Sequence, residues 1–186
     1  MDKKEIRKLS IQKRNAMSET ERAEYSSRIC AELSAYCEKY SIKKVLAYAA
    51  YGSEVNLDAF IQDCFGAGIT VYLPKVLGDT MEFFRVKSFA DLVPGYKGIR
   101  EPQTTETIAD FADTLLVFPG AAFDFNRNRI GYGGGFYDAY FKQNGSKITH
   151  SVAVCFSCQT VDAIPADIWD QKPKKLLTEN GFFGQT

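Results

Sequence analysis

Four glycines fall within five positions of the chain: Gly131, Gly133, Gly134 and Gly135. Glycine loses more backbone entropy on folding than any other residue, so such a cluster indicates a place where side chains would be in the way. One such place is a loop whose backbone N–H groups surround phosphate oxygens and which leads into the N-terminus of a helix. The alternative is a glycine-rich turn without chemical importance.

The residues that flank the glycines favour a binding site over a simple turn. Arg129 precedes the loop and supplies a cation, whereas Asp138 follows it and supplies a carboxylate of the kind that holds the magnesium of a nucleotide. Tyr137 adds an aromatic ring. Two familiar phosphate motifs do not fit, because the P-loop requires a Lys-Ser or Lys-Thr pair after its glycines and the dinucleotide fingerprint requires a glycine at Phe136. The stretch therefore predicts a phosphate loop of a third kind.

Length, composition and charge describe an ordinary soluble domain. The 186 residues suffice for one domain, and 45% of them are hydrophobic. Basic and acidic residues balance at 23 each, so the overall charge attracts no polyanion and we expect no nucleic-acid partner. No apolar run approaches the ~20 residues of a membrane span, and the N-terminal residues lack the apolar core of a signal peptide. We therefore expect a cytoplasmic protein with no membrane partner.

The five cysteines and the single histidine support neither a disulfide framework nor a zinc site. An odd number of cysteines without an export signal indicates reduced thiols. Cys155 and Cys158 have the spacing of a redox motif, but the alternating run Ser151–Phe156 predicts a strand, on which residues three apart face opposite sides. We therefore expect buried thiols, and a structural role for His150 in the same strand.

The spacing of apolar residues predicts the elements that position these groups. Residues Asp2 to Met17 are expected to form a basic helix, and the capping box Ser18–Glu21 is expected to open a second helix. Lys3, Arg7 and Arg14 fall on one face of the first helix at spacings of four and seven. That face is either a binding surface or a solvated cationic surface.

The next segments predict a βαβ unit with a right-handed crossover between parallel strands: a strand over Val45–Tyr51, a helix over Leu57–Phe65 and a strand over Ile69–Leu73. We expect Pro74 to end the second of these strands. Glu54 follows the first strand, so it lies at the carboxyl edge of the sheet, where open α/β sheets bind ligands. A glutamate there is equally consistent with a partner for the helix dipole.

The second half of the chain predicts further strands of the same sheet. Ser88–Asp110 is expected to form a long irregular connection, which inside a domain is often functional. A helix is expected from the glycine loop to about Gln143, and the segments 123–129, 159–165 and 169–170 are expected to be loops. The expected strands are Met81–Val86, Asp113–Phe118, Ile148–Phe156 and Lys175–Thr178. We predict one α/β domain over residues 1–186, with three layers, a mostly parallel open sheet and helices on both faces.

Several of these motifs, in this order, resemble the 5-formyltetrahydrofolate cyclo-ligase family, whose members are also called methenyltetrahydrofolate synthetases. The resemblance runs over nearly the whole chain, and the glycine loop with its aromatic pair and Asp138 is its most specific part. The matching segments are Lys3 with Arg7, Gly52–Val55, Tyr72–Pro74, Phe118–Asp124, Asn128–Asp138, Gln159 with Ile164–Pro165, Asp170 and Leu177–Glu179.

The resemblance implies an ATP- and magnesium-dependent conversion of 5-formyltetrahydrofolate to 5,10-methenyltetrahydrofolate, with release of ADP and phosphate. Arg129, Tyr137 and Asp138 would be catalytic, and Asp138 and Asp170 would hold Mg²⁺. Ala49, Glu54 and Tyr137 would bind the folate substrate, in free or polyglutamylated form. The residues that would bind ATP, the co-substrate, are Lys3, Arg7, Arg129, Gly131, Tyr132, Gly133, Gly134, Gly135, Phe136 and Tyr137. We expect the protein to act as a monomer.

The chain departs from the family pattern at three places. Phe136 replaces the more usual first tyrosine of the aromatic pair, which keeps the ring but loses a hydroxyl. Pro173 and Lys174 stand near the position where many members carry an aspartate. Tyr96 and Lys97 stand where some members have a tryptophan over the pterin, so that contact is left unassigned.

The chemistry suits the residues. A formyl group on nitrogen is an amide, and transfer of the γ-phosphoryl group of ATP to its oxygen gives an iminium phosphate that the second folate nitrogen can attack. Such a reaction needs mostly positioning and charge neutralisation. Two alternatives remain: an ATP-dependent kinase or ligase for another small molecule, and a non-catalytic module that binds a nucleotide or sugar phosphate. The pair Asp138 and Asp170 and the balanced charge argue against the second alternative.

Overall fold

The structure is a computed structural model that describes residues 1–165, 167 and 170–183, so Trp169 lies outside the described residues. Its centre is a seven-stranded sheet in the order β12-β11-β9-β6-β1-β2-β3. In that order the strands are Gly181–Phe183, Lys175–Thr178, His150–Val154, Thr114–Phe118, Lys44–Leu46, Thr70–Leu77 and Thr80–Val86. The five inner strands are parallel, whereas the edge strands β3 and β12 pair antiparallel with their neighbours.

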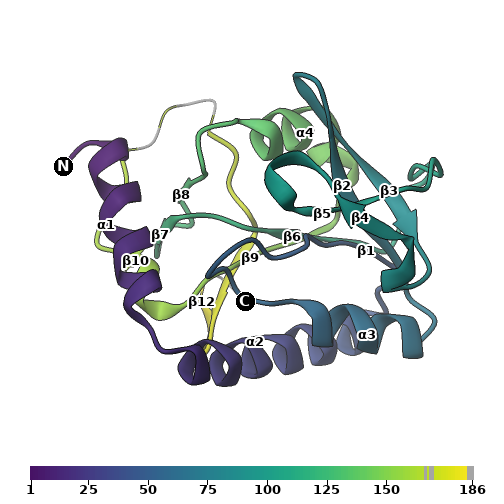
Figure 1. The fold of residues 1–186 in the computed structure, drawn as a ribbon, viewed down its shortest axis with the longest axis horizontal. Coiled ribbons are helices and arrows are strands. Elements are labelled where there is room, and N and C mark those ends of the chain that lie inside the picture. The colour runs from purple at the N-terminus through teal and green to yellow at the C-terminus, as the bar shows by residue number, and fades with distance from the viewer. Residues whose placement is uncertain (166, 168–169, 184–186) are drawn as a thin grey trace.

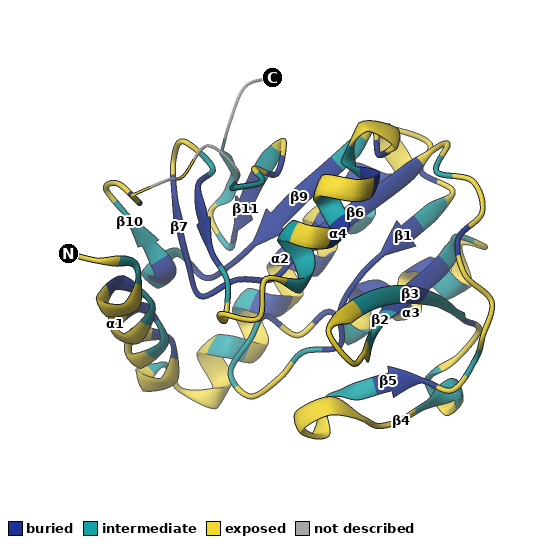
Figure 2. Cartoon of the chain, turned by 90° about the horizontal axis from the view of Figure 1, so that it is seen from above, coloured by how far each residue is buried: buried dark blue, intermediate teal, exposed yellow. Residues whose placement is uncertain are grey.

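Helices cover both faces of this sheet. Helices α2 (Glu19–Lys39) and α3 (Asp58–Gly66) pack on one face, and α4 (Phe136–Asn144) packs on the other (Figure 1). The inner strands β1, β6 and β9 are buried between these layers, as Figure 2 shows. The predicted fold class, a mostly parallel α/β sheet with helices on both faces, is confirmed.

The first two helices begin where the sequence predicts. The carboxylate of Asp2 accepts a hydrogen bond from the backbone N–H of Glu5, whose own carboxylate accepts from Asp2, and this capping box starts α1 (Lys3–Ala16). Ser18 and Glu21 exchange the same pair of bonds at the start of α2. Such reciprocal bonds satisfy backbone donors that a helix N-terminus otherwise leaves open. Helix α1 lies at one end of the sheet, against β7 (Ala122–Asp124) and a short 3₁₀ helix, η4 (Ser157–Gln159).

Two strand boundaries differ from the prediction by more than two residues. Strand β1 ends at Leu46, before the expected end at Tyr51, and Tyr48, Ala49 and Tyr51 of the following turn line a cavity. Strand β2 continues through Pro74 to Leu77, so the expectation that Pro74 ends it is wrong. Pro74 lies beyond the residues of β2 that pair with β1, and only β3 pairs with it there, so its missing N–H costs no bond to a second strand.

Three segments expected to be irregular form small sheets. The connection after Ser88 contains η1 (Phe89–Asp91), η2 (Tyr96–Gly98) and a two-stranded ribbon of β4 (Leu92–Pro94) and β5 (Arg100–Pro102). The expected loops around residues 123–129 and 159–165 contribute β7 (Ala122–Asp124), β8 (Arg129–Ile130) and β10 (Thr160–Val161) to a three-stranded sheet. The remaining element is the 3₁₀ helix η3 (Gly145–Lys147).

One buried carboxylate explains why the chain around β7 is ordered. Asp124 accepts hydrogen bonds from the backbone N–H and the side-chain amide of Asn128 and from the backbone N–H of Ile164. A fully buried carboxylate needs such donors because it has lost its water. Periodicity carries no signal for this arrangement, which explains why these segments were expected to be loops.

The cysteines and the histidine are structural, as expected. The five cysteines are unpaired, and four of them are buried while Cys158 is half-buried. Burial raises the pKa of the Cys30 thiol to about 11, which makes it a poor nucleophile. The Nδ1 atom of His150 shares a hydrogen bond of 2.9 Å with the hydroxyl of Tyr36.

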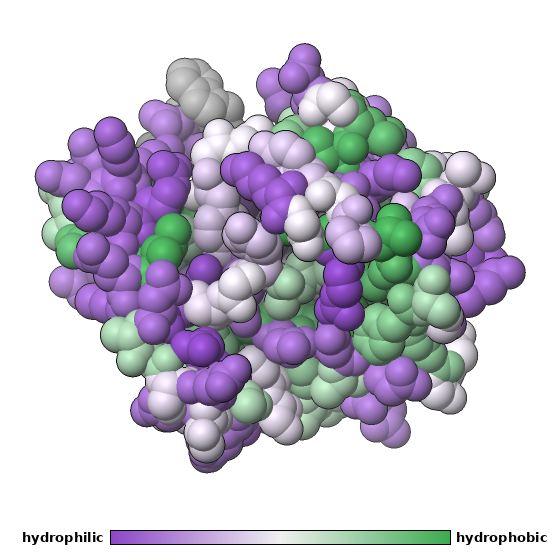
Figure 3. Space-filling model, in the orientation of Figure 1, coloured by the Kyte–Doolittle hydropathy of each residue, from purple (hydrophilic) through white to green (hydrophobic). Residues whose placement is uncertain are grey.

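One face of the molecule illustrates how polar and apolar residues are distributed on the surface. On the face seen in Figure 3, polar residues dominate and hydrophobic residues appear in small groups. No helix in the described part of the chain is long and apolar enough to cross a membrane.

Candidate active site

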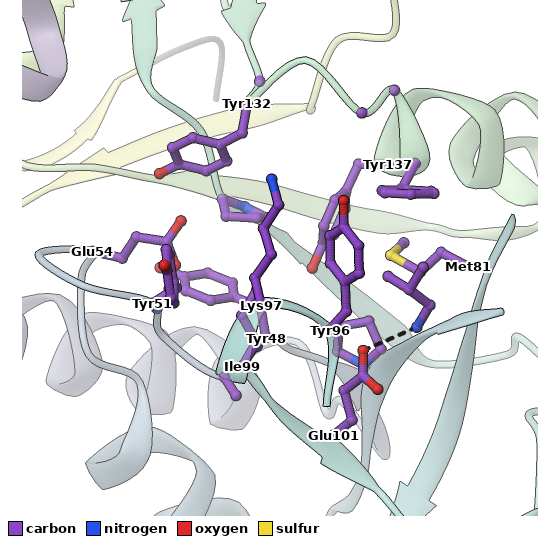
Figure 4. Close-up of a pocket in the computed structure, with 18 of the residues that line it drawn as sticks. Tyr48, Tyr51, Glu54, Met81, Tyr96, Lys97, Ile99, Glu101, Tyr132 and Tyr137 are labelled. Carbon is purple, nitrogen blue, oxygen red and sulfur yellow. Dashed lines mark hydrogen bonds between the residues drawn. The ribbon is translucent and has the colours of Figure 1, made fainter. Parts of the chain in front are cut away.

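A cavity of about 380 Å³ opens at the carboxyl ends of the parallel strands. Four parts of the chain supply most of its lining (Figure 4): the turn after β1, the β2–β3 hairpin, the β4–β5 ribbon, and the glycine loop with the start of α4; Pro119 and Arg129 complete it. The lining residues are Tyr48, Ala49, Tyr51, Glu54, Pro74, Val76, Met81, Tyr96, Lys97, Ile99, Glu101, Pro119, Arg129, Gly131, Tyr132, Gly134, Gly135, Phe136, Tyr137 and Asp138. The structure therefore brings most of the predicted site residues together; Lys3, Arg7, Gly133 and Asp170 are not among the lining residues.

The glycine loop needs glycine for reasons that differ between positions. Gly133 and Gly135 have φ values of 101° and 67°, a left-handed conformation that residues with side chains rarely adopt. A side chain on Gly134 would begin 2.8 Å from the ring of Phe136, and one on Gly131 would begin 3.1 Å from the guanidinium of Arg129. The loop can therefore present its backbone without obstruction.

The loop ends at the N-terminus of α4, which has no side-chain cap. Gly135 occupies the N-cap position and makes no side-chain hydrogen bond there. The first backbone N–H groups of α4 consequently lack a partner within the helix, and together with the helix dipole they suit an anion.

Arg129 adds a buried cation beside the loop. Its Nη2 donates to the Oδ1 of Asp138 at 2.6 Å, and its Nη1 donates to the carbonyl of Pro119 at 3.3 Å. Only 3% of the Arg129 side chain is exposed, whereas 41% of the Asp138 side chain is exposed. Arg129 is thus oriented by Asp138, and a second oxygen of Asp138 remains available at the surface.

Helix α1 brings two further cations to this end of the sheet. The Nε of Arg7 donates to the carbonyl of Gly131 at 2.7 Å, a contact between residues 124 positions apart. Lys3 lies 2.6 Å from a carboxylate oxygen of Asp170 and 2.7 Å from one of Asp167. Partial burial opposes the charged form of Asp170, but the hydrogen bonds from Lys3 and the backbone of Asp167, with the charges of Lys3 and Arg129, lower its pKa below the ordinary value. Asp170 is therefore ionised at neutral pH.

Tyr137 places a hydroxyl in the cavity wall without a protein partner. The hydroxyl is buried and makes no hydrogen bond within the described part of the chain. Its ring packs against those of Phe83 and Phe118, with centroids 6.2 and 6.0 Å away. Burial and then the charge of Glu54 raise the pKa of Tyr137 far above its ordinary value, so the hydroxyl stays protonated. It can donate a hydrogen bond to a ligand.

Glu54 lies across the cavity from the β4–β5 ribbon (Figure 4). Its carboxylate accepts a hydrogen bond of 2.8 Å from the backbone N–H of Tyr51. Burial raises the pKa of Glu54, while the Tyr132 hydroxyl, the Tyr51 N–H and the charge of Arg14 act in the opposite direction. The position at a strand's carboxyl edge agrees with the prediction, and the side chain faces a ligand cavity.

Arg14 positions other parts of the site, whereas the sequence predicted only that it lies on the cationic face of the first helix. It is 5% exposed, and it donates to the Oγ of Ser53 at 2.9 Å and to the hydroxyl of Tyr132 at 2.6 Å. Arg14 thereby joins the turn that carries Glu54 to the glycine loop. The spacing of seven from Arg7 was the available signal, and it could not separate this buried arginine from a solvated one.

The remaining lining residues were not predicted one by one. Most of them stand on the turn after β1, on β2 and β3, and on the β4–β5 ribbon, where periodicity does not reveal which side chains face a cavity. They are Tyr48, Tyr51, Pro74, Val76, Met81, Tyr96, Lys97, Ile99, Glu101 and Pro119.

Together these features define an α/β protein with a ligand cavity at the carboxyl edge of its parallel strands, bounded by a glycine loop at a helix N-terminus. Residues 1–179 match the model of the 5-formyltetrahydrofolate cyclo-ligase family. The chain belongs to this family, and it is an enzyme of the ligase class.

Individual relatives agree with this membership. The 5-formyltetrahydrofolate cyclo-ligase of Mus musculus is 26% identical over 185 residues, covering 91% of this chain and 89% of the relative. The solved structure of 5,10-methenyltetrahydrofolate synthetase from Aquifex aeolicus is 32% identical with a TM-score of 0.84, and the match covers 100% of this chain and 96% of that one. A synthetase structure from Mycoplasma pneumoniae is 26% identical with a TM-score of 0.77, covering 96% and 99%.

Proposed function

We propose that the chain converts 5-formyltetrahydrofolate to 5,10-methenyltetrahydrofolate with consumption of ATP and release of ADP and phosphate. Family membership supports the cyclo-ligase reaction. The observation that carries the residue assignments is that one cavity joins Glu54 and the unpartnered hydroxyl of Tyr137 to Arg129 and the uncapped N-terminus of α4.

The phosphates of ATP would lie at the glycine loop. Backbone N–H groups there would donate to phosphate oxygens, since α4 has no side-chain cap and Gly133 and Gly135 hold the loop open. Arg129, Arg7 and Lys3 would supply positive charge around the same region. The contact of Arg7 with the Gly131 carbonyl supports this assignment, because it fixes the cation against the loop itself.

The folate would enter the same cavity with its pterin ring between apolar walls and polar ends. Pro74, Val76 and Met81 of the β2–β3 hairpin offer apolar surface. Glu54 would accept hydrogen bonds from N–H groups of the substrate, next to the backbone at Ala49. Tyr137 would donate its hydroxyl proton in a hydrogen bond to the formyl oxygen.

The proposed reaction transfers the γ-phosphoryl group from ATP to the formyl oxygen, and ADP leaves. The resulting carbon is bonded to a phosphorylated oxygen and carries an iminium nitrogen, so the second folate nitrogen can attack it. The carbon–oxygen bond then breaks, inorganic phosphate departs, and the attacking nitrogen loses its proton. The protein's contribution is to align the two substrates and to neutralise the charge of the transferring group.

Asp138 and Asp170 fit a magnesium ion that is shared with phosphate oxygens. No three His, Cys, Asp or Glu side chains in the described residues could together hold a metal. Mg²⁺ on nucleotides, however, is usually held by one or two carboxylates, several waters and the phosphates themselves. Both carboxylates already lie beside cations, Arg129 and Lys3, in the part of the site assigned to ATP. When bound, the ion would neutralise phosphate charge.

The test is a spectrophotometric assay with purified protein, 5-formyltetrahydrofolate and magnesium-ATP, in which near-ultraviolet absorbance follows the methenyl product. Growth of this absorbance that requires both ATP and magnesium is the expected result. ATP binding without product would discard the folate half of the proposal, and a screen for ADP release with other substrates would then follow.

We further propose a cytoplasmic monomer that binds neither nucleic acid nor membrane and that also accepts polyglutamylated folate.

A further inference from the structure

Glu101 is a buried carboxylate in the wall of the cavity. It stands on β5 of the ribbon, and the residue is 7% exposed. Its Oε1 accepts a hydrogen bond of 3.2 Å from the backbone N–H of Val76 (Figure 4). No lysine or arginine in the described part of the chain forms an ion pair with it, whereas Asp138 and Asp170 each have a cationic partner. A buried carboxylate with a single long hydrogen bond is costly unless further donors reach it.

A glycine, Gly95, lies directly against this carboxylate. A side chain on Gly95 would begin 2.1 Å from the Oε2 of Glu101, so only glycine allows the carboxylate to occupy its position. The donor of Gly95 is already used, because its backbone N–H donates to the carbonyl of Ile99. Oε2 has no hydrogen-bond partner of its own in the described residues. Donors on a ligand in the cavity can therefore bond to this oxygen.

Glu101 and Glu54 stand on opposite sides of the cavity (Figure 4). Each accepts one hydrogen bond from the backbone, and each has further lone pairs for a ligand. A flat ligand between them would have to carry N–H donors on both edges. Arg7 and Arg129, by contrast, lie at the glycine loop, and Lys97 of the β4–β5 ribbon also lines the cavity.

We propose that Glu101 accepts hydrogen bonds from N–H groups of the substrate's pterin ring and is a specificity-determining residue for that ring. The proposal rests on the proposed function and adds a residue to it. A ring edge that carries N–H donors satisfies the carboxylate, whereas a ring with carbonyl oxygens at that edge brings two acceptors together and leaves a buried charge without a donor.

The test compares Glu101→Gln with wild type in steady-state kinetics and in equilibrium binding of 5-formyltetrahydrofolate with a non-hydrolysable ATP analogue present. The amide can keep its bond from Val76 through oxygen, but it then turns N–H groups toward ligand donors. We expect the KM and the dissociation constant for the folate to rise at least about tenfold, with the KM for ATP unchanged. Glu82→Gln is the matched control, because Glu82 also accepts a backbone N–H bond but does not line the cavity.

A second variant guards against loss of the fold. Gly95→Ala keeps the carboxylate but displaces it, so it should weaken folate binding in the same direction, and thermal unfolding identifies any variant that is not folded. Unchanged folate affinity in folded Glu101→Gln, or an equal loss in Glu82→Gln, would overturn the proposal. Failure of wild type to form product would instead refute the proposed function, so the two failures are distinguishable.

Discussion

Replacing Tyr137 by phenylalanine should change stability and activity in opposite directions. The substitution removes only a hydroxyl that is buried and unpartnered in the described structure. A buried polar group without a partner costs about 1–3 kcal/mol, so its removal should stabilise the free protein by up to that amount. For a chain of this length 1 kcal/mol corresponds to roughly 2–4 °C in Tm. The loss of one neutral hydrogen bond to the formyl oxygen, about 0.5–1.5 kcal/mol, should lower kcat/KM by about 2- to 13-fold.

Tyr140 provides the control for this experiment. It lies on the same helix, its hydroxyl is also buried without a partner among the described residues, and it does not line the cavity. Tyr140→Phe should therefore raise Tm similarly and leave kcat/KM unchanged. Thermal unfolding and the absorbance assay measure the two effects. A Tyr137→Phe protein that unfolds at a clearly lower temperature than wild type, or that retains full activity, would show that the hydroxyl does not serve to bond the substrate.

Three other substitutions test the remaining parts of the site. Arg7→Ala should weaken ATP binding by about 1.5–3 kcal/mol, the value of a charge-assisted hydrogen bond. The same substitution at the exposed neighbour Lys8 should leave ATP binding unchanged. An unchanged KM for ATP in Arg7→Ala would show that Arg7 does not bind ATP. Asp138→Ala should lower turnover at least about 100-fold, by loss of a proposed magnesium ligand and of the partner that orients Arg129; near-normal turnover at saturating magnesium would contradict the assignment. Glu54→Gln should remove a pH dependence of stability. Because burial raises the pKa of Glu54 above 4.5, the folded wild type binds more protons than the unfolded chain above that pH, so its stability falls as pH rises through the raised pKa. The Tm of Glu54→Gln minus the Tm of wild type should accordingly increase from pH 4 to neutrality. A difference that does not change with pH would refute the argument.

Local patterns predicted the elements whose boundaries are set locally. The capping boxes at Asp2 and Ser18 fix helix starts through bonds between residues three apart, so the sequence shows both partners at once. Pro74 shows the limit of such reasoning. Proline disrupts a strand only where a neighbour needs its N–H, and that depends on where β1 ends, which no local pattern encodes.

The residues of the site also fall into those that local sequence predicts and those that it does not. The glycine loop, Arg129 and Asp138 were visible because they are adjacent in sequence and carry a recognisable combination of residue types. Arg14 and Glu101 were not recognised, because a single arginine on a helix or a glutamate in an irregular connection is usually exposed. Their role follows from burial, and burial depends on elements far away in the chain, as the contact of Arg14 with Tyr132 across 118 positions illustrates.

The distribution of charge in the site indicates where each proposed ligand would lie. Arg7 and Arg129 meet at the glycine loop, next to the uncapped end of α4, so this end of the site favours phosphate. Glu54 and Glu101 line the cavity without an ion-pair partner among the described residues, so their carboxylates favour N–H donors, although Lys97 lines the same cavity. A triphosphate and a pterin ring would each find one favourable end. Tyr137 belongs both to the first turn of α4 and to the lining of the cavity, so its hydroxyl would be near the group that both substrates share in the proposed reaction.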